Sequence, residues 1–210
     1  MKLGIIGSGN IGGSIGKWAS KFGYEVTFSA RNIKHAEEAA KEAGNNSKYG
    51  NSHNAVSSAD LVLLAVPYPA VKDVLKEIGP ELRGKILIDA TNPLNQDYSG
   101  LSIGFTTSAA EEIQKMVPEA KVVKAFNSVF SSIYESQHSE LSGKKIAVFY
   151  AGDDSSAKAK TAELITKLGF EAVDAGGLQS ARTIEPLAML NITLGYAQGH
   201  GTNIGFSFLH

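Results

Sequence analysis

The chain has 210 residues, of which 43% are hydrophobic and 20% charged, a balance that indicates a soluble globular protein with one large domain, or one domain and a small appendage. Its formal net charge of −1 offers no basic field to nucleic acid or anionic lipid, and the absence of cysteine excludes disulfides, thiolate metal sites and a cysteine nucleophile. No apolar run approaches the ~20 residues that span a bilayer, and no secretory leader is visible, so we expect a cytoplasmic protein with no nucleic-acid or membrane partner.

Short apolar runs alternate with amphipathic stretches along the first two thirds of the chain. LVLLAV (61–66) is continuously apolar, which is typical of a central parallel strand covered on both faces. Ile11, Ile15 and Trp18 recur at helical spacing, and Gly23 is placed to end that helix. We expect strands at 3–7, 24–30, 48–50, 61–66, 85–90 and 120–126, and helices at 11–22, 33–44, 71–78 and 108–117.

The alternation of strands and helices predicts an α/β protein with a Rossmann-type, doubly wound parallel sheet and right-handed crossovers. The remaining pattern predicts a strand at 144–152, a helix at 155–169 capped by Asp154 or Ser155, a strand at 170–176 and a helix at about 180–197. We therefore expect two parts: a nucleotide-binding Rossmann domain at 1–140, and a small C-terminal α/β unit at 141–210 that extends or flanks the same sheet.

A glycine-rich motif, Gly7-Ser8-Gly9-Asn10-Ile11-Gly12, directly follows the first strand and opens the first helix. In this context the G-x-G-x-x-G pattern indicates dinucleotide binding. Gly7 permits the tight turn, Gly9 lets the backbone approach a pyrophosphate, and Gly12 lets the helix pack closely on the strand. No Gly-Lys-Ser/Thr follows at the offset of a Walker loop, so a P-loop nucleotide triphosphatase is excluded.

The end of the second strand indicates which dinucleotide is bound. NAD-binding folds usually place Asp or Glu there to hold the ribose 2′-hydroxyl, but this chain has Ser29, Ala30, Arg31 and Asn32. Arg31 can pair with a 2′-phosphate and stack on adenine, while Ser29 and Asn32 can donate hydrogen bonds. This pattern favours NADP over NAD.

Three further strands carry AVPYPAV (65–71), DATNPL (89–94) and KAFNSVF (124–130) at their carboxyl ends, where a nicotinamide ring would lie. Thr91 and Asn92 could hold ribose or carboxamide. For Asn92 and Asn127 an ordinary turn is an equal alternative, because Asn-Pro is a common turn. Lys124 and Asn127 have the spacing of the lysine–asparagine pair of some hydroxyacid dehydrogenases, but Lys124 falls inside a strand. The five histidines show no metal-ligand spacing.

We therefore assign no catalytic acid–base residue and no metal ligand. The lack of an acid–base pair favours direct hydride transfer to an acceptor that needs little proton transfer, such as a flavin ring.

In their order and spacing these motifs resemble the NADPH-dependent reductases of the deazaflavin coenzyme F-420, which are related to the cytosolic NADPH–flavin domain of six-transmembrane ferrireductases. The resemblance covers nearly the whole chain. It is carried by GIIGSGNIGGSIGKWASKFGYEVTFSARN, AVPY, TNPL, KAFN, GDD, VDAGGLQSARTIEPLAML and a terminal IGF.

The resemblance implies a usually dimeric protein that holds NADP(H) with its nicotinamide facing a small flavin-like substrate: FMN, FAD or the deazaflavin. It also implies a role for each matched position. Ser8 to Ile11 (Ser8, Gly9, Asn10 and Ile11) would cradle the pyrophosphate, Arg31 would meet the 2′-phosphate, Val66, Pro67 and Asn92 would border the ribose and nicotinamide, and Ala125 to Asn127 would lie beside the carboxamide.

Two positions depart from the family pattern near the 2′-phosphate. The family often has Ser-Arg where this chain has Ala30-Arg31, and His35 replaces a frequent lysine, with Lys34 adjacent.

Two other functions remain open from the sequence. The chain could be an NADPH-dependent reductase of a small imine or carbonyl compound, although about 60 residues after Gly152 leave little room for the long dimerisation helices of such enzymes. It could also be a non-catalytic redox sensor that binds NADP(H) and signals to a partner.

Overall fold

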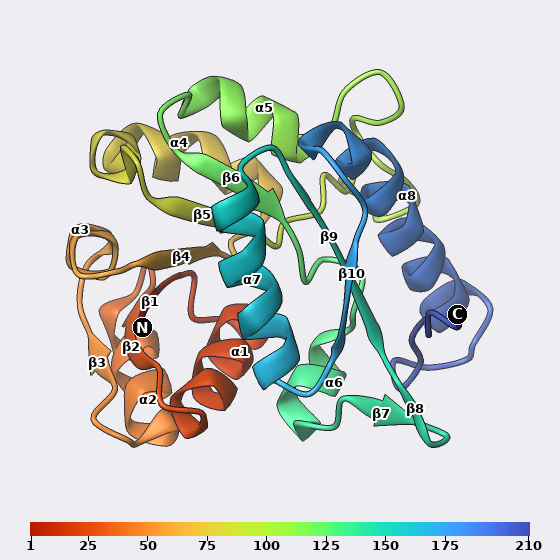
Figure 1. Ribbon diagram of the computed structural model, residues 1–210, viewed down its shortest axis with the longest axis horizontal. Helices are drawn as coiled ribbons and strands as arrows, with labels where there is room; N and C mark the ends of the chain where they lie inside the picture. The colour runs from red at the N-terminus through yellow and green to blue at the C-terminus, as the bar shows by residue number, and fades with distance from the viewer.

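An eight-stranded sheet forms the middle layer of the computed structural model, which describes residues 1–210 (Figure 1). Its strand order is β10-β9-β6-β5-β4-β1-β2-β3. All neighbouring pairs are parallel except β6 and β9, which run antiparallel. The strands are β1 (Lys2–Ile6), β2 (Glu25–Ser29), β3 (Lys48–Tyr49), β4 (Leu61–Leu64), β5 (Ile86–Asp89), β6 (Lys121–Lys124), β9 (Ala147–Gly152) and β10 (Glu171–Asp174).

The central strands are buried on both faces, as their apolar sequences require. Every residue of β4 and β5 is buried, and Leu61 pairs with Ile86 in the register between them. The chain order reverses at β1, which lies between β2 and β4. In an open α/β sheet such a reversal leaves a crevice at the carboxyl ends of the two strands, and ligands bind there.

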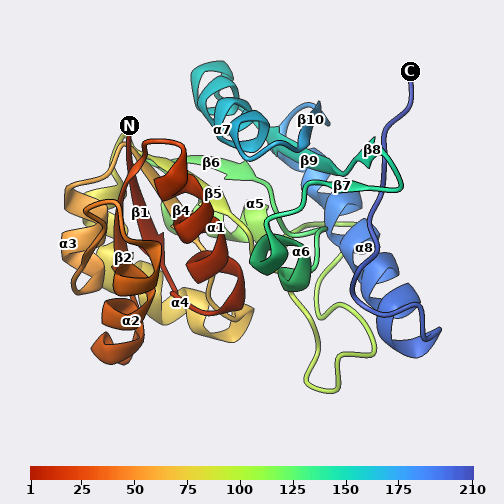
Figure 2. The same ribbon diagram turned by 90° about the horizontal axis from the view of Figure 1, so that it is seen from below.

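Helices cover both faces of the sheet, and each face has its own hydrophobic core. Figures 1 and 2 show α1 and α7 together on one side. That side also holds α2 and α6, and the other side holds α3, α4 and α5. The helices are α1 (Asn10–Lys21), α2 (Ile33–Ala43), α3 (Ser52–Ser57), α4 (Tyr68–Ile78), α5 (Ala109–Met116), α6 (Ser131–Ser136), α7 (Ser155–Lys167) and α8 (Ala181–Ile192). None of them is long and apolar enough to cross a membrane.

The expected Rossmann-type α/β fold is confirmed, and β9 and β10 extend its parallel sheet, with β9 antiparallel to β6. Between β6 and β9 the chain passes through α6 and a hairpin of β7 (Glu140–Leu141) and β8 (Lys144–Lys145), rather than through a crossover helix. Ser142 and Gly143 both adopt positive φ, which suits a two-residue hairpin turn. This hairpin also divides the single strand expected at 144–152.

Further differences are confined to short elements and ends. The helices α3 and α6 were not expected, since each has only six residues and little periodicity. The helix expected at 180–197 is α8 continued by a π-helical turn, Thr193–Ala197. The expected cap of α7 is confirmed, because Asp154 Oδ1 accepts a hydrogen bond from the Ala157 N–H at 2.8 Å.

An aromatic cluster joins the last third of the chain to the first. Phe170, which precedes β10, packs edge-on against Trp18 of α1, with ring centroids 5.2 Å apart. It also packs against Tyr134 of α6 at 5.6 Å. All three side chains are buried. The strands β9 and β10 are therefore attached through this cluster as well as through the β6–β9 pairing.

We predict that Phe170→Ala lowers the free energy of unfolding by about 3–5 kcal/mol, because it removes a fully buried ring and leaves a cavity. Urea denaturation followed by circular dichroism measures this change. The control Phe208→Ala removes a half-exposed ring and is expected to change stability by less than about 0.5 kcal/mol. Equal effects of the two substitutions would contradict the proposed attachment.

Candidate functional site

The turn from β1 into α1 requires glycine at two positions. Gly7 has a φ of +99°, and a Cβ there would lie 2.6 Å from the Ala65 carbonyl oxygen. A Cβ on Gly12 would clash with the carbonyl oxygen of Gly7. These contacts show why α1 can pack so closely on β1, as the glycine motif predicts.

Gly9 differs from Gly7 and Gly12, because no protein atom lies close to the position of its missing side chain. Gly9 is exposed, and a Cβ built there would meet no atom within 4 Å. Gly9 is the N-cap of α1, where no side chain caps the helix and the first turn contains no acidic residue. The open backbone and the positive end of the helix dipole therefore fit a pyrophosphate.

Ser8 and Ser29 support this loop from inside. The Ser8 hydroxyl donates to the Ser29 carbonyl at 2.9 Å, and the Gly7 N–H donates to the same oxygen at 3.0 Å. The Ser29 hydroxyl donates to the Ile5 carbonyl at 2.9 Å and is buried. The only hydroxyl proton of Ser29 is therefore used between β1 and β2, so the expected hydrogen bond to a 2′-phosphate would require this hydroxyl to turn away from Ile5.

Arg31 follows β2 at this end of the crevice and carries a positive charge without a protein partner. Its side chain is exposed and forms no ion pair. Asn32 is the N-cap of α2, where its Oδ1 accepts from the Lys34 N–H at 3.1 Å, so its amide N–H groups alone remain available. The first turn of α2 contains no acidic residue. These features suit a 2′-phosphate, held mainly by Arg31.

At the other end of the crevice the structure brings Asn92 and Asn127 together, although they are 35 residues apart. Asn92 Nδ2 donates to the Asn127 carbonyl at 2.8 Å, and Asn127 Nδ2 donates to Asn92 Oδ1 at 2.9 Å. Ala125 is buried beside them on the β6 side. Val66 and Pro67 follow β4, where Pro67 is the exposed N-cap of α4.

Several polar atoms near this pair are buried without a partner. They are Asn127 Oδ1, Thr91 Oγ1 and Ser128 Oγ. Buried polar groups in proteins are usually hydrogen-bonded, so such atoms point to a ligand or ordered water. A nicotinamide carboxamide, which both donates and accepts hydrogen bonds, fits them.

Phe126 shapes the loop between Ala125 and Asn127 in a way that the sequence did not reveal. It is fully buried and adopts a φ of +67°, a conformation that costs energy for a bulky side chain. Its carbonyl accepts a hydrogen bond from the buried Tyr134 hydroxyl at 2.8 Å. This contact from α6 holds the turn that directs Asn127 toward Asn92.

A buried ionic cluster lies directly behind the asparagine pair. Lys124 Nζ lies 2.8 Å from Asp89 Oδ2 and 3.0 Å from Glu185 Oε1, and all three side chains are fully buried. We call these three residues the Lys124 cluster. Burial by itself would lower the pKa of Lys124, but the two carboxylates outweigh it and the pKa lies above its usual value. Lys124 is therefore charged and bonded inside the protein, as its place in a strand indicated, and is not exposed to a substrate.

Glu185 is a site-supporting residue that the sequence analysis missed. It lies on the face of α8 that also carries the buried Ile184 and Ala188. The sequence did contain a sign of this role, which is an acidic residue among apolar residues at helical spacing. Burying a carboxylate requires dedicated partners.

Several known proteins are similar to this chain in sequence or in structure. A family model described as NADP oxidoreductase, coenzyme F420-dependent, matches residues 2–93. The F420-dependent NADP reductase of Methanothermobacter thermautotrophicus is 31% identical over 209 residues, which cover 92% of this chain and 89% of that protein. Metalloreductase STEAP3 of Rattus norvegicus is 31% identical over 90% of this chain, which spans 37% of that longer protein. A crystal structure from Arthrobacter sp. FB24, assigned as an F420-dependent NADP reductase, matches all of both chains with a TM-score of 0.89 and 29% identity.

The fold, the glycine loop and these relatives define an NADP-dependent oxidoreductase with a Rossmann-type sheet. More particularly, the chain belongs to the family of F420-dependent NADP oxidoreductases.

We predict that Gly9→Ala leaves the free energy of unfolding within about 0.5 kcal/mol of wild type, because no protein atom opposes the added methyl group. The same methyl group should weaken NADPH binding by at least about tenfold, or about 1.4 kcal/mol, because it occupies the surface that a pyrophosphate approaches. Urea denaturation and fluorescence titration with NADPH measure the two quantities.

The matched control is Gly79→Ala, at the C-cap of α4, where the backbone angles are helical and a Cβ would make an ordinary contact of 3.4 Å with Val117. It should change neither quantity appreciably. If Gly9→Ala binds NADPH as tightly as the wild type, the pyrophosphate does not bind at this loop.

Proposed function

We propose that this protein transfers hydride between NADP(H) and the ring of a deazaflavin of the F420 type, with FMN and FAD as related acceptors. The observation that carries the proposal is the arrangement of the crevice. An anion-binding loop at β1 and a paired, partly unsatisfied asparagine site beyond β5 and β6 lie at two ends of the same sheet edge. A dinucleotide that extends between them would present its nicotinamide at the asparagine end.

Each end of the crevice has a defined task in this proposal. The residues Ser8, Gly9, Asn10 and Ile11 bind the pyrophosphate, and Arg31 binds the 2′-phosphate and so selects NADP over NAD. Asn92 and Asn127 orient the carboxamide, while Val66, Pro67 and Ala125 line the ribose and ring. When bound, NADPH supplies the hydride itself, so the protein has to orient the ring and exclude water rather than provide an acid or base.

We also propose a division of the chain at residue 140, with residues 1–140 binding the nucleotide and residues 141–210 completing the acceptor side. A homodimer is supported by large apolar side chains left exposed, including Tyr98, Phe105 and Tyr196. A cytoplasmic location is supported by the absence of cysteine, which suits a reducing compartment.

Anaerobic oxidation of NADPH by the purified protein tests the proposal, with F420, FMN, FAD or no acceptor, and again with NADH. We expect fast turnover with one ring system and with NADPH in preference to NADH. Tight NADPH binding without oxidation by any ring would overturn the proposal, and would favour a small imine or carbonyl substrate or a redox sensor.

We predict that Arg31→Ala weakens NADPH binding by about 1–3 kcal/mol, the range for loss of a charge-assisted hydrogen bond, and changes NADH binding little. Isothermal titration calorimetry with both nucleotides measures the difference. The control Arg83→Ala removes another exposed arginine, which pairs with Glu119, and should affect neither nucleotide. Equal losses for NADPH and NADH in Arg31→Ala would contradict the 2′-phosphate assignment.

A further inference from the structure

The Lys124 cluster carries a net negative charge inside the protein. It contains one ammonium and two carboxylates, all fully buried. Asp89 accepts hydrogen bonds from the Thr91 N–H at 2.9 Å and from Lys124 at 2.8 Å. Glu185 accepts from Lys124 and from the first two N–H groups of α5, Ala109 at 2.9 Å and Ala110 at 3.2 Å. Every hydrogen-bonding partner of the two carboxylates is a donor, which is the arrangement that a carboxylate, an acceptor at both oxygens, requires.

This charge lies directly behind the asparagine pair. Lys124 Nζ donates to the Thr91 carbonyl at 2.6 Å, and Thr91 immediately precedes Asn92. On the other side, Asn127 Nδ2 approaches the carbonyl of Ile184 at 3.5 Å, and Ile184 immediately precedes Glu185. Thr91 therefore links the cluster to Asn92, and Ile184 links it to Asn127, each through one hydrogen bond.

The field of the cluster reaches the crevice. Tyr68 directly follows Val66 and Pro67 and begins α4. Burial and the negative charges of Glu112, Glu185 and Asp89 together raise the pKa of Tyr68 to about 12. A tyrosine becomes harder to ionise where the local potential is negative, so two carboxylates of the cluster act on a side chain next to the proposed nicotinamide site.

The stability of the fold does not by itself require an ion cluster at this place. Desolvation of buried charges commonly cancels their attraction, and apolar residues of similar volume often support a fold equally well. A net charge at the end of the crevice does, however, distinguish the two forms of the cofactor. The nicotinamide ring is positive in NADP+ and neutral in NADPH, and low-polarity surroundings strengthen its interaction with a nearby charge.

We infer that the Lys124 cluster is an electrostatic device that stabilises the positive nicotinamide ring of NADP+ relative to the neutral ring of NADPH, and so sets the redox balance of the bound cofactor. This inference rests on the proposed function, since it assumes that nicotinamide binds beside Asn92 and Asn127. Asp89, Lys124 and Glu185 act through their field and touch neither cofactor nor acceptor.

Two near-isosteric variants, Glu185→Gln and Asp89→Asn, each remove one negative charge from a different element. Calorimetry gives the dissociation constants of NADP+, NADPH and 2′-phospho-ADP-ribose, which lacks nicotinamide. In each variant we expect NADP+ to weaken relative to NADPH by about tenfold, the effect of one charge acting through a partly screened interior. The affinity for 2′-phospho-ADP-ribose should stay within about twofold of wild type. Because the two variants alter different elements, Asp89→Asn decides the question if Glu185→Gln does not fold.

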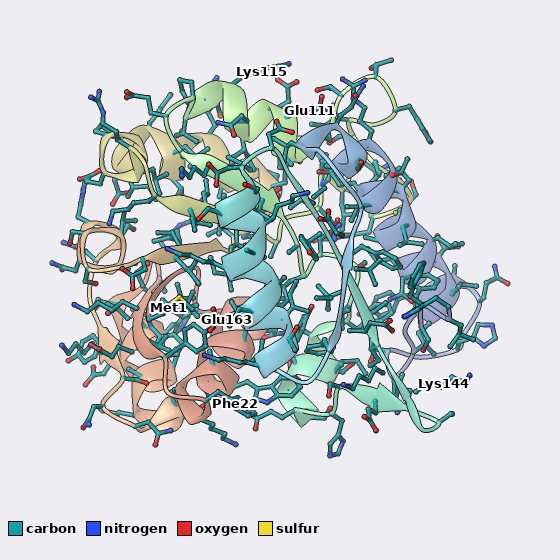
Figure 3. The ribbon with its side chains drawn as sticks, in the orientation of Figure 1. Met1, Phe22, Glu111, Lys115, Lys144 and Glu163 are labelled. Carbon is teal, nitrogen blue, oxygen red and sulfur yellow. The ribbon has the colours of Figure 1, made fainter.

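The matched control is Glu111→Gln. Glu111 also joins α5 to α8, through Arg182 at 2.7 Å and 2.9 Å, but it is partly exposed. Figure 3 shows Glu111 where α5 lies beside the start of α8. Its loss should leave the NADP+ to NADPH ratio unchanged. Equal weakening of NADP+ and NADPH in Glu185→Gln and Asp89→Asn, or an equal shift of the ratio in Glu111→Gln, overturns the inference. If the wild-type protein binds neither nucleotide, the proposed function fails first.

Discussion

The position of the nicotinamide end of the site depends on the ion pairs that Lys124 makes inside the protein. One ammonium group joins the ends of β5 and β6 to α8, and through Glu185 it also joins them to the N-terminus of α5. Removing one partner from a buried pair typically costs about 3–5 kcal/mol, because the remaining charge stays buried without compensation. Asn92 and Asn127 follow these strand ends directly, so their mutual hydrogen bonds depend on the same contacts.

The phosphate end of the site is built on a different physical basis, which is close backbone packing without side chains. Gly7 and Gly12 are required by contacts within the protein, whereas Gly9 meets nothing and leaves a surface for a ligand. The two ends therefore differ in how they tolerate change. At the glycine loop, added volume is harmful, while at the asparagine pair, loss of charge or of a hydrogen bond is harmful.

The antiparallel strand β9 also affects the site. Because β9 and β10 run opposite to β6, their carboxyl ends do not extend the row of strand ends that forms the crevice. The side of the site beyond β6 is instead bounded by α8. Asn191 of α8 donates to the Ser128 carbonyl at 3.0 Å, and Glu185 reaches Lys124. The last third of the chain thus contributes to the site through a helix rather than through loops after strands.

The family relationship covers residues at both ends of the site. The family model matches residues 2–93, which contain the glycine loop, Arg31 and Asn92, and the similarity to the reductase of M. thermautotrophicus extends over nearly the whole of both chains. The use of Ser29 as an internal donor leaves Arg31 as the main candidate for the 2′-phosphate in this chain.

The sequence by itself determined the α/β class, the glycine loop, and the strand ends where the site residues lie, because apolar runs, helical spacing and glycine requirements are local properties. Only the tertiary structure decided how Ser29, Lys124 and Glu185 are used. Ser29 lies two residues before Arg31 in the sequence, yet its hydroxyl donates to Ile5 on the neighbouring strand. Lys124 and Glu185 are 61 residues apart and meet only because α8 packs against the end of β6. The direction of β9 likewise followed from a hairpin at Ser142 and Gly143 that an apolar pattern does not encode. Partners and strand direction are set by long-range packing, which a pattern along the chain cannot specify.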